Sequence, residues 1–200
     1  MKARALLWLA IFFVVLTWSA VNPADRATWW LEVLPALVGL ALLVFTRKSF
    51  PLTPLCYWLI LAHCIVLMVG GHYTYAEVPL GEWVEQWVGG SRNNYDKLGH
   101  FAQGFVPAIL AREVLIRKNV VCGQGWLNYI VVSVVLAFSA FYELIEWWVA
   151  LLSEEASDSF LGTQGYIWDT QSDMLFALVG ASLALLLLSK LHNRQINALR

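Results

Sequence analysis

The sequence predicts an all-α protein that crosses a membrane several times. Hydrophobic residues make up 60% of the 200-residue chain, charged residues make up 14%, and the mean hydropathy is +0.63. A soluble domain typically has about 25% charged residues, so this composition indicates a membrane protein. Because no segment alternates apolar and polar residues as membrane β-strands do, we expect the spanning elements to be helices.

Six apolar runs are long enough to cross a bilayer, which takes roughly 20 helical residues. The hydropathy pattern places the spans at about Ala5–Val21, Trp29–Thr46, Pro54–Gly70, Leu98–Ile116, Tyr129–Leu151 and Met174–Ser189. The first run could be read as a signal peptide, but bulky Trp18 stands where cleavage needs small residues, so we expect a retained span. Together the runs predict a single integral membrane domain over residues 1–200.

The basic residues are unevenly distributed over the segments that join these runs. With the N-terminus inside, all but three of the thirteen lysines and arginines lie in cytoplasmic segments, and the three outside are Arg26, Arg92 and Lys97. The positive-inside rule therefore predicts that both termini are cytoplasmic. Because the basic residues form no compact surface, we expect no nucleic-acid partner.

The first large outer loop, Gly71–Tyr95, contains a short amphipathic segment between Gly81 and Gly89. One face of this predicted helix carries two tryptophans and two valines, and the other carries Glu82, Glu85 and Gln86. Aromatic residues on the apolar face are typical of an anchor in the membrane interface, which is the interpretation we favour. A lid over a lipid-facing site is the alternative.

Ionisable side chains gather at the predicted outer ends of the last three spans. They form three pairs, which are Asp96 and His100, Glu143 and Glu146, and Asp169 and Asp173. Residues three or four apart share one helical face, so each pair can point into the bundle at a similar depth. A charge at the bilayer centre costs about 2.5–3.5 kcal/mol on insertion scales. The convergence therefore predicts a polar intramembrane site that opens outward.

The composition of this site favours a bound cation. Five carboxylates close together cannot all stay ionised without one. Oxygen ligands with one or two imidazoles suit a divalent metal ion such as Zn, Mn, Mg, Fe or Ca. The expected ligands are Asp96, His100, Glu143 and Asp173, with His72 at the outer end of the third span as a further candidate.

A metal at this site would support hydrolysis, because a bound divalent ion lowers the pKa of a coordinated water. In such an enzyme Glu146 or Asp169 would be the general base, and Lys97 would contact an anionic group of the substrate. Several of these residues also have simpler interpretations. Lys97 can snorkel beside Asp96, and Asp173 can cap the sixth helix.

Four segments resemble the YjdF family of bacterial inner-membrane proteins. They are Gly71–Tyr75, Asn94–Phe101, Tyr142–Trp147 and Trp168–Met174, so the resemblance covers almost the whole chain. It implies a multi-pass protein of the bacterial inner (plasma) membrane, and it supplies no reaction.

A more remote similarity is to VanZ-like membrane proteins, which are linked with glycopeptide (teicoplanin) resistance and the cell envelope. Their Asp-Lys-x-x-His-Phe motif is matched from Asp96 to Phe101. This chain departs from their pattern with Glu146 in place of Gln and Ala177 in place of Asn. The resemblance therefore supports the membrane class and the site, and it leaves the chemistry open.

These observations predict a membrane protein with an outward-opening polar site and leave open whether it is an enzyme. The first hypothesis is an enzyme that uses a metal for hydrolysis or group transfer on an envelope lipid or lipid-linked substrate within the bilayer. The second hypothesis is a proton-coupled transporter in which Glu143 and His100 exchange protons. The third is a structural or ligand-binding envelope protein without turnover.

Overall fold

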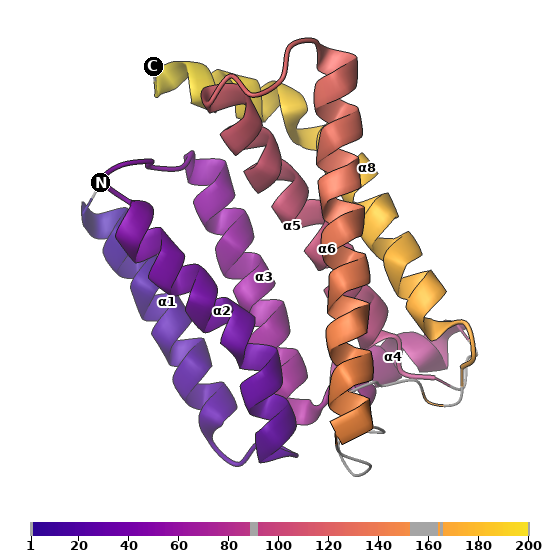
Figure 1. The fold of residues 1–200 in the computed structure, drawn as a ribbon. Helices are drawn as coiled ribbons and strands as arrows, with labels where there is room; N and C mark the ends of the chain where they lie inside the picture. The colour runs from indigo at the N-terminus through magenta and orange to yellow at the C-terminus, as the bar shows by residue number, and fades with distance from the viewer. Residues whose placement is uncertain (1, 89–91, 153–163, 165, 200) are drawn as a thin grey trace.

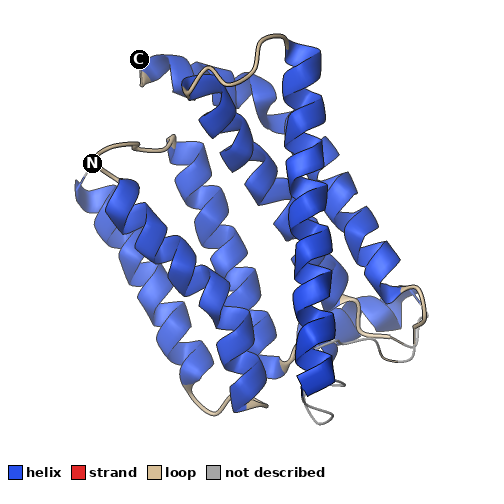
Figure 2. Cartoon of the chain, viewed as in Figure 1, coloured by secondary structure: helices blue, strands red, loops and turns tan. Residues whose placement is uncertain are grey.

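The computed structural model describes residues 2–88, 92–152, 164 and 166–199. Its regular structure is helical throughout, as Figure 2 shows, and no strand occurs among those residues. The all-α class predicted from the sequence is therefore confirmed.

Seven α-helices and one 3₁₀ turn follow one another along the described chain (Figure 1). They are α1 (Lys2–Ala20), α2 (Arg26–Thr46), α3 (Pro54–Tyr73), η1 (Tyr75–Glu77), α4 (Pro79–Val88), α5 (Tyr95–Arg117), α6 (Gln124–Leu152) and α8 (Asp169–Ala198). The long helices alternate in direction, so both termini lie at one end of the bundle and α4 lies at the other. We call these the terminal end and the α4 end.

Five of these helices are long and apolar enough to cross a membrane, namely α1, α2, α3, α6 and α8. The helix at the fourth predicted span, α5, has 23 residues but is more polar, with Asp96, Lys97, Arg112 and Glu113 buried along it. It packs against α3, α6 and α8. Its charged side chains therefore face other helices, which explains why composition alone does not mark it as a span.

Local sequence sets the starts of α2 and α3. The side chain of Asp25 caps α2 by accepting a 2.6 Å hydrogen bond from the amide of Thr28, which holds the pKa of that carboxyl below its usual range. Thr53 caps α3 and is followed by Pro54, whose missing amide hydrogen is harmless in the first turn of a helix. Both helices thus begin where a cap is available.

Two buried apolar clusters hold the bundle together. The first joins α1, α2 and α3 through Phe12, Val33 and Met68, all of them fully buried. The second joins α3, α5, α6 and α8, and its centre includes Ile109 and Val131. Helix α3 belongs to both clusters, so it connects the first two helices to the half of the bundle that carries the ionisable residues.

Helices α5 and α8 approach each other unusually closely because small residues face one another. A Cβ atom added at Gly104 would collide with the backbone carbonyl of Ala177, and one added at Gly180 would collide with the carbonyl of Phe101. Small residues at such crossings let two backbones pack directly in membrane proteins. This crossing sets the distance between the polar residues at the start of α5 and those at the start of α8.

The predicted amphipathic segment forms α4, so its helical character is confirmed. Its apolar face is open, since Trp83 and Trp87 are 65% and 92% exposed. Its place in the membrane interface stays a prediction. The loop from Ser153 to Thr163 lies outside the described residues.

Candidate functional site

Ionisable side chains of α5, α6 and α8, and Arg92 from the segment before α5, meet at the α4 end of the bundle. We call this group the acidic cluster, and its members are Arg92, Asp96, Lys97, His100, Glu143, Glu146, Asp169 and Asp173. All of the acids among them are buried, and their exposed fractions are as low as those of the apolar core residues. The convergence predicted from the three residue pairs is confirmed.

Lys97 joins α5 to α8 by a pair of short ionic contacts. Its Nζ atom lies 2.6 Å from an oxygen of Asp169 and 2.6 Å from an oxygen of Asp173. Arg92 contacts the same oxygen of Asp169 at 2.5 Å. The group predicted to contact a substrate anion, Lys97, and one of the two predicted general bases, Asp169, therefore already bind one another. Their catalytic roles stay predictions.

His100 is the centre of the cluster. Its Nε2 atom lies 3.2 Å from Oδ1 of Asp96 and 4.0 Å from Oδ1 of Asp173. Its Nδ1 atom lies 3.2 Å from the side-chain oxygen of Gln103 and 3.7 Å from Oε1 of Glu143. Both ring nitrogens thus face hydrogen-bond acceptors. With the Nδ1 hydrogen directed at Gln103 and Glu143, Nε2 needs a proton or a metal ion to satisfy the two aspartates.

Three of the predicted metal ligands have the spacing that an ion requires. The ligand atoms of Asp96, His100 and Asp173 all lie within 4.8 Å of one another, and all three residues are buried. Glu143 contacts the opposite nitrogen of His100 and orients the ring from there. Oxygen and imidazole ligands of this kind suit a borderline or hard divalent ion.

The remaining predicted ligand, His72, lies apart from this group. Its Nδ1 atom is 3.1 Å from the carbonyl of Ser19, and its ring packs 4.5 Å from that of Trp18. In the described part of the chain His72 therefore ties the end of α3 to the end of α1. Its role as a ligand stays a prediction that the arrangement does not favour.

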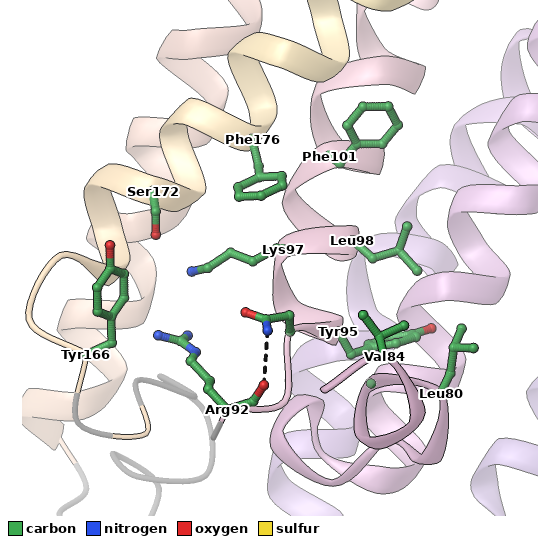
Figure 3. A pocket seen from close by; sticks show the side chains of 12 residues that line it. Leu80, Val84, Arg92, Tyr95, Lys97, Leu98, Phe101, Tyr166, Ser172 and Phe176 are labelled. Atoms are coloured by element: carbon green, nitrogen blue, oxygen red, sulfur yellow. Dashed lines mark hydrogen bonds between the residues drawn. The ribbon is translucent and has the colours of Figure 1, made fainter. Parts of the chain in front are cut away.

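Two hollows lie on opposite faces of α5. The larger one, of about 610 Å³, is a groove between α4, α5 and α8. Figure 3 shows Arg92 and Lys97 pointing toward Tyr166 at one side of this groove, while Leu98 and Phe101 form part of its apolar wall. The smaller hollow, of about 260 Å³, lies between α2, α3, α5 and α6 and includes Asp96, His100 and Glu146 in its lining.

Sequence reasoning missed Glu32, which belongs to this smaller hollow. Its side chain is 4% exposed in α2, and the hydroxyl of Tyr142 donates a 3.5 Å hydrogen bond to it. The available signal was a single acid inside the second apolar run, which by itself indicates a functional or paired position.

Sequence reasoning also missed a second buried polar group at the terminal end. We call it the Glu113 cluster, and its members are Thr53, Cys56, Arg112, Glu113, Arg117 and His192. The carboxylate of Glu113 accepts hydrogen bonds from the amide and hydroxyl of Thr53, so it lies at the start of α3 where a negative charge is favourable. It also accepts from Cys56, His192 and Arg117.

The spacing of Cys56, Glu113 and His192 would suit a metal ion, but their hydrogen bonds indicate otherwise. Arg112 lies 3.0 Å from Nδ1 of His192, and a guanidinium can only donate. Nδ1 is therefore the acceptor, and Nε2 carries the hydrogen that it donates to Glu113 at 3.0 Å. A metal ligand needs a free lone pair at that nitrogen, so we interpret this cluster as a hydrogen-bonded link between α3, α5 and α8.

The fold and the two buried clusters define a polytopic membrane protein that places charged groups inside its helical bundle. Residues 4–194 match the family described as "Predicted membrane protein (DUF2238)", and the chain belongs to this family. It is 51% identical over 183 residues to the inner membrane protein YjdF of Escherichia coli (strain K12), which covers 92% of this chain and 88% of the relative. No solved structure matches the chain at a significant level. The similarity to VanZ-like proteins rests on the sequence motifs alone.

Proposed function

We propose that the chain is a six-span inner-membrane protein whose acidic cluster binds a divalent metal ion and acts on an envelope lipid by hydrolysis or group transfer. The observation that carries this proposal is the buried trio of Asp96, His100 and Asp173, with ligand atoms within 4.8 Å of one another. If Nδ1 of His100 donates to Gln103 and Glu143, the lone pair of Nε2 faces both aspartates, which is the tautomer that a metal site requires.

The groove on the face of α5 that carries Lys97 supports a lipid as the substrate, and Lys97 connects this groove to Asp173 of the trio. It combines apolar walls from Leu98, Phe101 and Phe176 with the basic groups of Arg92 and Lys97 at one side (Figure 3). An amphiphile with an anionic headgroup has this same division into polar and apolar parts. Because Lys97 is held between two aspartates, it would position the headgroup together with the metal rather than act alone.

Among the predicted general bases, Glu146 fits better than Asp169. Asp169 contacts both Arg92 and Lys97, whereas no described residue forms an ion pair with Glu146. A carboxylate without a cationic partner accepts a proton more readily, as a general base must.

The orientation is part of the proposal. The positive-inside rule predicts that the terminal end lies in the cytoplasm and the acidic cluster on the outer side, with α5 as the fourth of the six spans. The test uses a topology reporter fused after Arg200 or inserted next to Cys122, and both positions should report the cytoplasm. A reporter between Ser153 and Ser159 should report the outside, and a cytoplasmic signal there would refute the outward-opening site.

The metal is tested by elemental analysis of the full-length protein purified without chelators. We expect about one divalent ion per chain, lost in His100→Ala and retained in the matched variant His63→Ala, since His63 lies outside the trio. If the wild-type protein carries no ion and binds none when Zn²⁺ or Mn²⁺ is added, the metal assignment is wrong.

A second candidate, proton-coupled transport, is favoured by the 3.7 Å contact between His100 and Glu143. It predicts a metal-free protein that passes protons into liposomes carrying a pH-sensitive dye. It also predicts that His100→Ala abolishes this flux. If the purified protein contains a metal and gives no proton flux, transport is excluded and the metal-dependent enzyme remains.

A further inference from the structure

The smaller hollow beside α5 differs in charge from the rest of the acidic cluster. It has a volume of about 260 Å³ and lies between α2, α3, η1, α5 and α6. Three carboxylates line it, those of Glu32, Asp96 and Glu146, together with the imidazoles of His63 and His100, and none of the described lining residues is a lysine or an arginine. We call this hollow the α2–α6 cavity.

The basic residues of the acidic cluster lie on the other face of α5. Arg92 and Lys97 line the groove, where both contact Asp169, and Lys97 also contacts Asp173. Of the three carboxylates in the α2–α6 cavity, only Asp96 has ionic partners among the described residues. It lies 3.6 Å from Arg92, 3.6 Å from Lys97 and 3.2 Å from His100. Glu32 and Glu146 therefore form no ion pair with a described residue, and His100, which also lines the cavity, contacts Asp96 instead.

Glu146 is the clearest case. Glu146 lines the cavity and is 8% exposed, yet no described residue donates a hydrogen bond to it or lies within ion-pair distance of it, and His100 acts on its charge from farther away. Glu32 is more deeply buried and is approached by the hydroxyl groups of Tyr75 and Tyr142, which carry no positive charge. Removing an ionised carboxylate from water without a partner is strongly unfavourable, so a cation that enters this cavity would allow both glutamates to pair with it in their ionised form.

The other walls of the cavity indicate which kind of cation fits. Four aromatic rings line it, those of Tyr75, Phe138, Phe141 and Tyr142. Aromatic faces combined with carboxylates bind organic ammonium groups, as in the aromatic cages that hold choline or methyl-lysine. Calcium instead requires six to eight oxygen ligands, and magnesium requires near-ideal octahedral oxygen coordination. The aromatic lining thus favours a soft organic cation.

Size and access agree with a small ligand. Each water molecule occupies about 30 Å³ in the liquid, so the cavity has room for an ammonium group with a few carbon atoms. Phe138 and Phe141 line the cavity and are themselves 63% and 51% exposed on the bundle surface. The cavity therefore reaches the surface beside α6, where the membrane would lie.

We propose that the α2–α6 cavity binds an ammonium group, with Glu32 and Glu146 as counter-charges and the four aromatic rings as its walls. The group comes from a small soluble amine or from an amine-containing lipid headgroup that enters beside α6. Glu32 and Glu146 lie outside the trio of Asp96, His100 and Asp173, but Asp96 and His100 also line the cavity, so ammonium binding is measured separately from metal binding.

The first test uses the purified full-length protein and compares three probes on the wild type. Tetramethylammonium chloride should raise the melting temperature with a saturable concentration dependence. Sodium chloride at the same ionic strength, and tert-butanol as a neutral molecule of similar shape, should give no such rise. An equal effect of sodium chloride, or no effect of tetramethylammonium, would overturn the proposal without reference to any variant.

The second test assigns the binding to the two carboxylates. Glu32→Gln and Glu146→Gln keep the size of the side chain, and each should weaken tetramethylammonium binding at least tenfold in calorimetric titrations. The matched control is Glu77→Gln, because Glu77 is an exposed acid at the same end of the bundle. Unchanged affinity in both glutamine variants would contradict the proposal, whether or not the preparation contains metal.

The third test distinguishes the two sources of the ammonium group in nanodiscs. If a lipid headgroup is the ligand, replacing part of the phosphatidylglycerol by phosphatidylethanolamine should stabilise the protein and reduce tetramethylammonium binding. If a soluble amine is the ligand, tetramethylammonium should bind equally in both kinds of nanodisc. Absence of tetramethylammonium binding in both would refute the site.

Discussion

The Nε2 atom of His100 lies 3.2 Å from Oδ1 of Asp96, one helical turn away on α5. With Gln103 and Glu143 at the other ring nitrogen, the imidazole cannot satisfy both sides in its neutral form. A proton or a metal ion must lie between His100 and Asp96, and these two possibilities predict different responses to chelators.

The first prediction concerns what occupies that position. If a metal is bound, a chelator should lower the melting temperature of the wild-type protein in detergent, because ligand-bound native states are stabilised by mass action. His100→Ala should melt lower and lose the response to chelator, and Glu143→Gln should weaken that response because the amide keeps the shape without the charge. If chelator does not change the melting temperature of the wild type, and Glu143→Gln melts at the same temperature as the wild type, the metal is excluded. A shared proton then remains as the explanation.

The second prediction concerns Lys97. Lys97→Met removes the contact to Asp173 and leaves that buried carboxylate without its nearest cation, while Asp169 keeps Arg92. Breaking a buried pair by removing one partner typically costs about 3–5 kcal/mol, and we expect a loss of free energy of unfolding in this range.

The coupling between Lys97 and Asp173 is tested with the double substitution Lys97→Met and Asp173→Asn. It should recover part of the loss, since the orphaned charge is gone, whereas the exposed control Lys48→Met should change stability little. Strictly additive effects of the two substitutions would show that Lys97 and Asp173 are not coupled.

The third prediction concerns the crossing of α5 and α8. Gly104→Ala should destabilise the protein by about 1–3 kcal/mol, because the new methyl group meets the backbone of Ala177 rather than a side chain that can move. The matched control is Gly39→Ala in α2, where nothing lies within 4 Å, and it should be neutral or stabilising by up to about 1 kcal/mol. Equal melting temperatures of the two variants would contradict the close crossing.

Helix positions were largely predictable because length and apolar composition are local properties. The third span was predicted to begin at Pro54, and α3 begins there. The sixth was predicted at Met174–Ser189, but α8 runs from Asp169 to Ala198. Hydropathy detects only the apolar middle of such a helix, whereas the helix itself continues through polar ends that pack on neighbours.

The acidic cluster was predictable because its members lie in pairs at helical spacing on the same ends of their helices. The Glu113 cluster was not, because its hydrogen bonds join residues that are far apart in the chain. Thr53 and Glu113 are separated by 60 positions, and Cys56 and His192 by 136. No periodic pattern connects such residues, and only the packing of α3, α5 and α8 brings them together. The charged partners of Lys97 were likewise set by the α5–α8 crossing.

The last prediction concerns the Glu113 cluster. Glu113→Ala removes the acceptor for the donors of Thr53, Cys56 and His192 at once, and unsatisfied buried donors each cost about 1–3 kcal/mol. We expect a large loss of stability and a loosening of the start of α3. The readout is the rate at which maleimide modifies Cys56, which is buried in the wild type. The background carries Cys122→Ser, because Cys122 is exposed and would react in every variant.

In that background, Cys56 should react slowly in the otherwise wild-type protein and much faster after Glu113→Ala. The second buried thiol, Cys64, serves as the internal control, because it lies in the other apolar cluster and should stay protected. Since the hydrogen bond from Arg112 leaves no lone pair for a metal at His192, a chelator should not change the reactivity of Cys56. Faster modification of Cys56 upon addition of chelator would show that an ion holds this cluster and that its interpretation as a hydrogen-bonded link is wrong.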